Sequence, residues 1–170
     1  TDAAAARGDV GAAPDENRMA GLSEFDLAEA IEDALVATGG ESNLADELLE
    51  HIRTEVTDDG VVIDIGGLPQ AHLFESGSDR PTERLAILLD MIGSVLPIVQ
   101  NEVAITAFRQ DGIRPASGIY RAESVAALLT RRNLSPSRIQ RVTGHATRED
   151  ADVVAEIRPD DRVKVTILRN

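Results

Sequence analysis

The sequence contains no cysteine and no tryptophan, and aromatic residues make up only 2% of its 170 positions. The absence of cysteine excludes disulfides, cysteine-ligated zinc, iron–sulfur clusters and thiol nucleophiles together. The shortage of aromatic rings argues against a stacking surface for single-stranded nucleic acid. No apolar run approaches the length of about 18 residues that a membrane-spanning helix needs. Because the sequence starts at Thr1 rather than at a methionine, we expect a processed protein or a fragment of a longer one.

Basic residues are scarce in the first third of the chain. Positions 1–59 carry 16 acidic and 3 basic residues, whereas positions 60–170 carry 14 of each, so the net charge of −13 belongs entirely to the first third. The neutral remainder offers no basic patch for duplex nucleic acid, and the acidic third is repelled by anionic lipid headgroups. We therefore expect neither nucleic acid nor a membrane surface as a direct partner.

Residues with the spacing of a catalytic or metal site are also lacking. The three histidines, at positions 51, 72 and 145, are far apart and show no carboxylate-linked spacing. No Ser/His/Asp set is recognisable, and the glycine pair at 66–67 lacks the context of a phosphate-binding loop. We predict a protein that is not an enzyme and that holds no metal and no cofactor.

The first 59 residues divide into two parts. Positions 1–20 are rich in Ala, Gly and Asp without periodicity, which predicts a flexible tail or linker. Positions 21–59 predict an acidic helical linker region, whose first helix starts after an N-cap at Ser23 and ends at Gly39. The apolar face of this helix consists of Phe25, Leu27, Ile31, Ala34 and Leu35. Apolar spacing predicts a second helix from Leu44 to Val56.

From Gly60 onward the patterns alternate between strand and helix periods. Strands are predicted at 61–65, 102–108, 138–144 and 162–168, with a brief additional strand at 73–78. Apolar stripes predict one helix from Pro81 to Leu96 and another from Ala122 to Asn133. This order predicts an α/β fold of the α+β type, in which a small mixed sheet has two helices on one face and forms one domain over 60–170.

Four segments in this order resemble the OmpA-like peptidoglycan-binding domain. They are LFESGS at 73–78, like the family's F-x-x-G-S; VAITAF at 103–108, like the strand before its G-H-T-D turn; YRAESV at 120–125, like its L-S-x-x-R-A helix start; and the strand at 139–144 with DDRVKV at 160–165, like its closing N-R-R-V-x-I strand. The acidic segment and TDDGVVIDI at 57–65 are similar to the periplasmic region of the MotB family of flagellar motor stator proteins. The resemblance implies an OmpA-like β-α-β-α-β sandwich.

The resemblance also implies a binding site for the peptide stem of peptidoglycan. The family reads the ammonium and the carboxylate of diaminopimelate with an Asp and an Arg. Arg121 matches the family Arg, in the first turn of a helix. Gln110 stands at the Asp position and Asp111 follows it, so either Asp111 takes over the role or the domain binds the wall weakly or not at all. Arg162 remains of the family's two arginines at the closing strand.

Three of these residues also have an ordinary structural interpretation. Arg121 could cover apolar surface with its stem. Asp111, followed by glycine, could form a turn, and Arg162 could join a cross-strand ion pair or reach the ligand pocket. The sequence leaves these alternatives open.

By this resemblance, the chain is a non-catalytic periplasmic module that anchors an ion-driven flagellar stator to peptidoglycan. The family implies a homodimer, a MotA-like partner subunit and one inner-membrane helix outside this chain. A second hypothesis keeps the fold for dimerisation or for docking to another envelope protein, with wall binding lost. A third, an envelope enzyme that acts on peptidoglycan, has no set of residues to support it.

Overall fold

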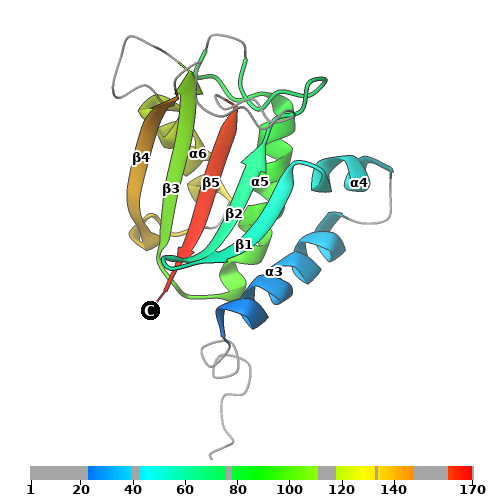
Figure 1. Cartoon of the computed structure of the whole chain (residues 1–170), viewed down its shortest axis with the longest axis vertical. Coiled ribbons are helices and arrows are strands. Elements are labelled where there is room, and N and C mark those ends of the chain that lie inside the picture. The colour runs from blue at the N-terminus through cyan, green and yellow to red at the C-terminus, as the bar shows by residue number, and fades with distance from the viewer. Residues whose placement is uncertain are drawn as a thin grey trace, which may run out of the picture.

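The computed structural model describes residues 23–39, 43–75, 78–110, 118–132, 134–147 and 161–169. A five-stranded sheet forms the centre of the molecule, and the helices of the domain cover one of its faces (Figure 1). The tail predicted at 1–20 lies outside the described residues.

The sheet is mixed and open. Its strands are β1 (Ile52–Thr57), β2 (Gly60–Gly66), β3 (Val103–Gln110), β4 (Ile139–Thr147) and β5 (Arg162–Leu168). Their spatial order is β1-β2-β5-β3-β4, and the pair β3–β4 is parallel while the other three pairs are antiparallel. This architecture confirms the predicted α+β class and the small mixed sheet.

The helices among the described residues are α3 (Glu24–Gly39), α4 (Asn43–Leu49), α5 (Glu83–Val95) and α6 (Ile119–Arg131), with short 3-10 turns at Leu96–Ile98 and Pro136–Arg138. The Thr82 side chain caps α5 by accepting a hydrogen bond from the backbone N–H of Leu85. Pro81, which was expected in the first helical turn, therefore precedes the cap. The α3 helix begins as predicted, because the Ser23 hydroxyl accepts a hydrogen bond from the Asp26 backbone N–H.

A single apolar core lies between the sheet and the helices. In β5 the inward residues Val163, Val165 and Ile167 are buried, and the residues between them are half-buried on the opposite face. This alternation is the two-residue period of a strand with one covered face. Helical residues that join the same core include Leu27, Ile31 and Leu35 of α3, Leu85, Leu88 and Ile92 of α5, and Ala122, Val125 and Leu129 of α6.

The second predicted helix is wrong beyond Leu49. Residues Ile52–Thr57 instead form β1, the edge strand that pairs antiparallel with β2. Apolar residues four apart, such as Ile52 and Val56, fit a helix face and also fit one face of a strand, so the spacing alone is ambiguous. The hairpin decides the outcome: Gly60 closes its turn with a φ of +143°, a conformation that glycine adopts without strain.

Two smaller expectations also fail. The brief strand predicted at 73–78 is, within the described part of the chain, an isolated bridge between Phe74 and Pro81. Phe25, which was predicted on the buried face of the first helix, is 75% exposed, whereas Leu27 and Ile31 are buried as predicted.

Candidate functional site

The start of α6 lies unusually close to the sheet. At Gly144 of β4 an added Cβ would lie only 2.0 Å from the backbone nitrogen of Ile119. Gly118 caps the helix with a φ of +104°, and a Cβ there would lie 2.8 Å from two strand carbonyl oxygens. Two glycines thus allow the first turn of α6 to rest on β3 and β4. That approach brings Arg121 to the end of β3.

Arg121 is buried at this end, with only 4% of its side chain exposed. Its Nε and Nη2 donate hydrogen bonds to the carbonyl oxygen of Ser78 at 3.1 and 2.7 Å, and its Nη1 donates to that of Phe108 at 3.3 Å. The guanidinium carbon also lies 4.5 Å from the centroid of the Phe74 ring, within cation–π range. Arg121 therefore joins α6, the end of β3 and the loop before α5.

A carboxylate that the sequence reasoning missed lies beside Arg121. Asp79 Oδ1 is 3.8 Å from Arg121 Nε and 2.7 Å from Nη1 of Arg109, near the end of β3. The Asp79 and Arg109 side chains are 31% and 27% exposed, so this ion pair is accessible from solvent. The only sequence signal for Asp79 is its position directly after the Gly-Ser of the LFESGS segment.

Asp161 fixes the loop that carries Phe74. Its carboxylate is buried, and its oxygens accept hydrogen bonds from the backbone N–H groups of Leu73 (3.0 Å) and Phe74 (3.2 Å). Its carbonyl oxygen accepts another from Gly67 at 2.8 Å. Asp161 thereby fixes the position of the loop that places the Phe74 ring next to the Arg121 guanidinium.

Arg162 lies on the other face of the sheet, where no helix of the described residues packs. Its Nε and Nη2 bind the two carboxylate oxygens of Asp64 at 3.0 and 2.5 Å. The hydrogen bond with Asp64 raises the pKa of the Arg162 guanidinium above its ordinary value, although partial burial opposes this shift. The cross-strand ion pair considered in the sequence analysis is therefore present, and Phe108 separates Arg162 from Arg121. The Phe108 carbonyl accepts from Arg121, while Arg162 lies 5.8 Å from the ring centroid.

Of the other two predicted ligand residues, the structure describes only Gln110. Gln110 is the last residue of β3, one position after Arg109. Asp111 lies outside the described residues, so its role stays a prediction.

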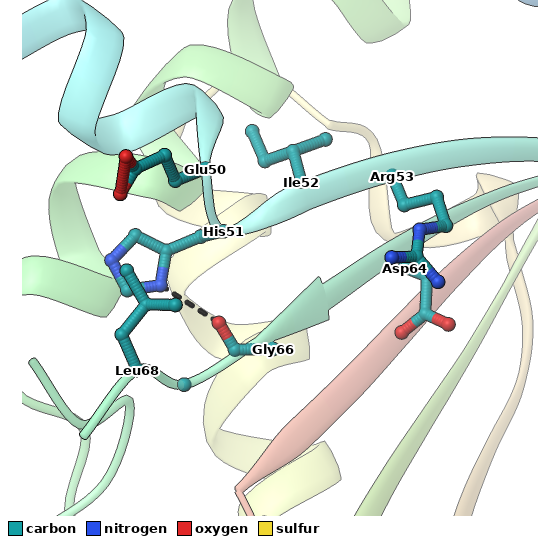
Figure 2. Close-up of a pocket in the computed structure, with 8 residues that line it drawn as sticks. Glu50, His51, Ile52, Arg53, Asp64, Gly66 and Leu68 are labelled. Carbon is teal, nitrogen blue, oxygen red and sulfur yellow. Dashed lines mark hydrogen bonds between the residues drawn. The ribbon is translucent and has the colours of Figure 1, made fainter. Parts of the chain in front are cut away.

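A small pocket lies beside β1, the edge strand opposite to β4 in the sheet (Figure 2). It has a volume of about 70 Å³, and its lining includes His51, Arg53 and Asp64. The His51 ring contacts the Gly66 carbonyl oxygen through Nδ1 at 2.7 Å, and its buried Nε2 has no hydrogen-bond partner among the described residues. Neither Arg121 nor Arg162 is among the described residues that line this pocket. Its volume suits a few water molecules rather than a peptide.

Metal-binding clusters and membrane-spanning helices are both absent from the described residues. No group of three or more histidine and acidic side chains in that part of the chain could hold a metal ion. None of the helices described there combines the length and the apolar character needed to cross a membrane.

The strand order β1-β2-β5-β3-β4, with helices on one face of the sheet, is that of an OmpA-like fold. A scan against protein-family models finds no match for the sequence, and a search of curated proteins finds none either. Solved structures are informative: the fold is similar to that of the periplasmic domain of Helicobacter pylori MotB, with a TM-score of 0.58, 17% identity, and 77% of this chain and 86% of that chain covered.

Two further structures agree with this assignment of the fold. A MotB-like protein from Desulfovibrio vulgaris matches with a TM-score of 0.56 at 13% identity, over 86% of this chain and 99% of that chain. The cell wall anchor of the type VI secretion system from Pseudomonas aeruginosa matches with a TM-score of 0.54 at 20% identity, over 75% of this chain and 94% of that chain. The chain therefore has an OmpA-like fold similar to that of MotB periplasmic domains.

Proposed function

We propose that this chain is a periplasmic, non-catalytic module that binds the peptide stem of peptidoglycan and anchors a flagellar stator to the cell wall. The observation that carries the proposal is the charged cluster at the end of β3, where Arg109, Arg121 and Asp79 of the described residues meet beside the start of α6. A partly exposed guanidinium such as that of Arg109 forms charge-assisted hydrogen bonds with carboxylates, which suits a ligand that carries a carboxylate.

The chemistry of diaminopimelate suits such a cluster. Its side chain ends in an ammonium and a carboxylate on one carbon, so a site that reads both needs an anion and a guanidinium a few ångströms apart. The similarity to MotB periplasmic domains and to a cell wall anchor supports the same ligand class. In the full stator we expect a homodimer, a MotA-like partner and a membrane helix supplied from outside this chain.

The direct test is co-sedimentation of the chain with insoluble peptidoglycan. We expect the wild type to pellet with the wall and to be released by soluble stem peptide that contains diaminopimelate. Wild-type protein that stays in the supernatant at every wall concentration would refute the proposal. A variant with a weakened surface ion pair elsewhere, Asp90→Asn, is the matched control, because Asp90 pairs with Arg132 on the α5 and α6 side of the molecule.

A second candidate function is protein docking or dimerisation without wall binding. It is favoured by the burial of Arg121, whose guanidinium already binds two main-chain carbonyls. The exposed Phe25 and Val36, eleven residues apart on α3, would supply apolar contacts on one side of that helix. Sedimentation equilibrium of Phe25→Ser against wild type tests it: a dimer that dissociates in the variant, together with no wall binding, would favour this function over the first.

A further inference from the structure

The outer edge of β1 presents main-chain groups that the sheet does not use. β1 is an edge strand, paired with β2 on one side only within the described part of the chain (Figure 1). The Gly66 N–H donates to the His51 carbonyl oxygen at 2.9 Å, and the hairpin register continues this alternation, so the odd-numbered residues of β1 bond to β2. The N–H and C=O groups of Ile52, Thr54 and Val56 therefore point away from β2. Such an edge is a template for a strand of another chain.

Two opposite charges flank the centre of this edge. Arg53 and Glu55 are exposed residues on either side of Thr54. Arg53 lies opposite Asp64, which binds Arg162, so both charged side chains of β1 lie on the helix-free face of the sheet. Charges on an edge strand normally oppose pairing with another chain. Here an acid and a base stand two residues apart, a spacing that lets the strand pair with a copy of itself.

One antiparallel register between two copies uses the whole edge. When Thr54 lies opposite Thr54 of the second copy, Ile52 lies opposite Val56, and each of these pairs exchanges both N–H···O=C bonds. The positions between them place Arg53 opposite Glu55 of the second copy, twice by symmetry. A shift of two residues one way puts Arg53 opposite Arg53, and the reverse shift puts Glu55 opposite Glu55. Like charges directly opposite are destabilising, so charge and hydrogen bonding select the same register.

We propose that the outer edge of β1 is the interface of a homodimer, in which the two sheets join into one continuous sheet across a twofold axis at Thr54. The partner is a second copy because the edge itself carries the acid–base pattern that its charges require in a partner strand, and a twofold axis pairs identical surfaces. This inference rests on the homodimer that the proposed function expects, whose surface it assigns. Strands β2 and β5 separate that surface from the charged cluster at the end of β3.

Charge reversal followed by mixing tests the register. Arg53→Glu makes both charged positions of the edge acidic, and Glu55→Arg makes both basic. We expect each variant alone to dimerise about tenfold more weakly than wild type in sedimentation equilibrium at low salt. An equimolar mixture of the two variants should dimerise again, because every Glu then faces an Arg. Two misfolded chains would not restore each other in this way. Arg141→Glu, which reverses an exposed charge on β4, is the matched control and should leave the dimer intact.

A main-chain variant tests the hydrogen bonds of the same edge. Thr54→Pro removes an N–H that points away from β2, so it spares the β1–β2 ladder and should also weaken the dimer about tenfold. Urea unfolding of each variant checks that the domain itself stays folded.

The outcomes separate this inference from wall binding. A wild type that is monomeric at every concentration overturns the inference, and so does a dimer that persists in Arg53→Glu, Glu55→Arg and Thr54→Pro. A mixture of the two charge variants that stays monomeric also overturns it, because the register then does not hold. Co-sedimentation with peptidoglycan is read independently: a monomeric wild type that pellets leaves wall binding in place, whereas a dimer of this register that never pellets overturns wall binding alone.

Discussion

At each end of β3, one arginine donates hydrogen bonds to two main-chain carbonyls, but the surroundings of the two arginines differ. At the start of the strand, Arg138 binds two main-chain carbonyls, and at its end Arg121 does the same. Burial lowers the pKa of the Arg138 guanidinium below its ordinary value, a sign that desolvation is not offset there by a carboxylate. The end with Arg121 adds the solvent-accessible ion pair of Asp79 and Arg109. The comparison teaches that both arginines, Arg121 buried and Arg138 half-buried, stabilise the backbone by binding carbonyls, and that the accessible pair beside Arg121 makes that end a candidate binding site.

The largest expected effect comes from adding a side chain at Gly144, where the start of α6 packs against β4. Gly144→Ala puts a Cβ against the backbone of Ile119, where no flexible side chain can move aside. We expect a loss of about 3 kcal/mol or more in the free energy of unfolding, measured by urea denaturation. Gly93→Ala is the control, because the nearest atom there is a side-chain atom of Arg132 at 3.1 Å. Equal stability of Gly144→Ala and wild type would contradict the close packing of α6.

Removing the buried carboxylate behind Phe74 should have the next largest effect. Asp161→Ala leaves the backbone N–H groups of Leu73 and Phe74 without their acceptor inside the core. We expect a loss of about 2–3 kcal/mol in the free energy of unfolding. Asp161→Asn, which keeps one acceptor oxygen, should lose less. If both variants unfold at the same urea concentration as wild type, Asp161 does not support the loop.

A matched pair of substitutions sharpens the comparison between the two ends. Arg121→Lys and Arg138→Lys each keep the charge but lose the planar fork that reaches two carbonyls at once. We expect each to cost about 1–2 kcal/mol in the free energy of unfolding, while only Arg121→Lys weakens peptide binding. Weakened binding in Arg138→Lys to the same degree would show that binding follows overall stability instead.

The smallest effect is expected on the helix-free face. Asp64→Asn removes the carboxylate that binds Arg162, whose side chain is 35% exposed and can turn to water. We expect a loss of about 1 kcal/mol or less in the free energy of unfolding, since solvent screens such a pair, and no change in peptide affinity. A loss of peptide affinity in this variant would move the binding site to the opposite face of the sheet.

Local patterns predicted much of the fold. The alternation of Val163, Val165 and Ile167 defined β5 to the residue, and the cap at Ser23 marked the start of α3. The segment at Ile52–Thr57 could not be assigned in this way, because its apolar spacing fits two periods and its partner strand decides between them.

The candidate site was less accessible from the sequence. Arg121 was found because it lies in a recognisable helix start, but its two carbonyl acceptors come from residues 13 and 43 positions away. Asp79 and Arg109 meet because the loop before α5 folds back on the end of β3, an event of tertiary packing that no local pattern encodes. Charged residues on exposed loops are too common for either to be singled out from the sequence alone.

The most direct test of the account is an NMR titration of the isotope-labelled chain with soluble diaminopimelate stem peptide. The account predicts that the largest shifts fall on the Asp79 amide and the Arg109 Nε–H signal, with smaller shifts at Ser78. Signals of Arg53 and Lys164, on strands β1 and β5, should stay unchanged. Shifts confined to the Arg162 face of the sheet, or no shift at any peptide concentration, would contradict the claim that this end of the domain binds the wall.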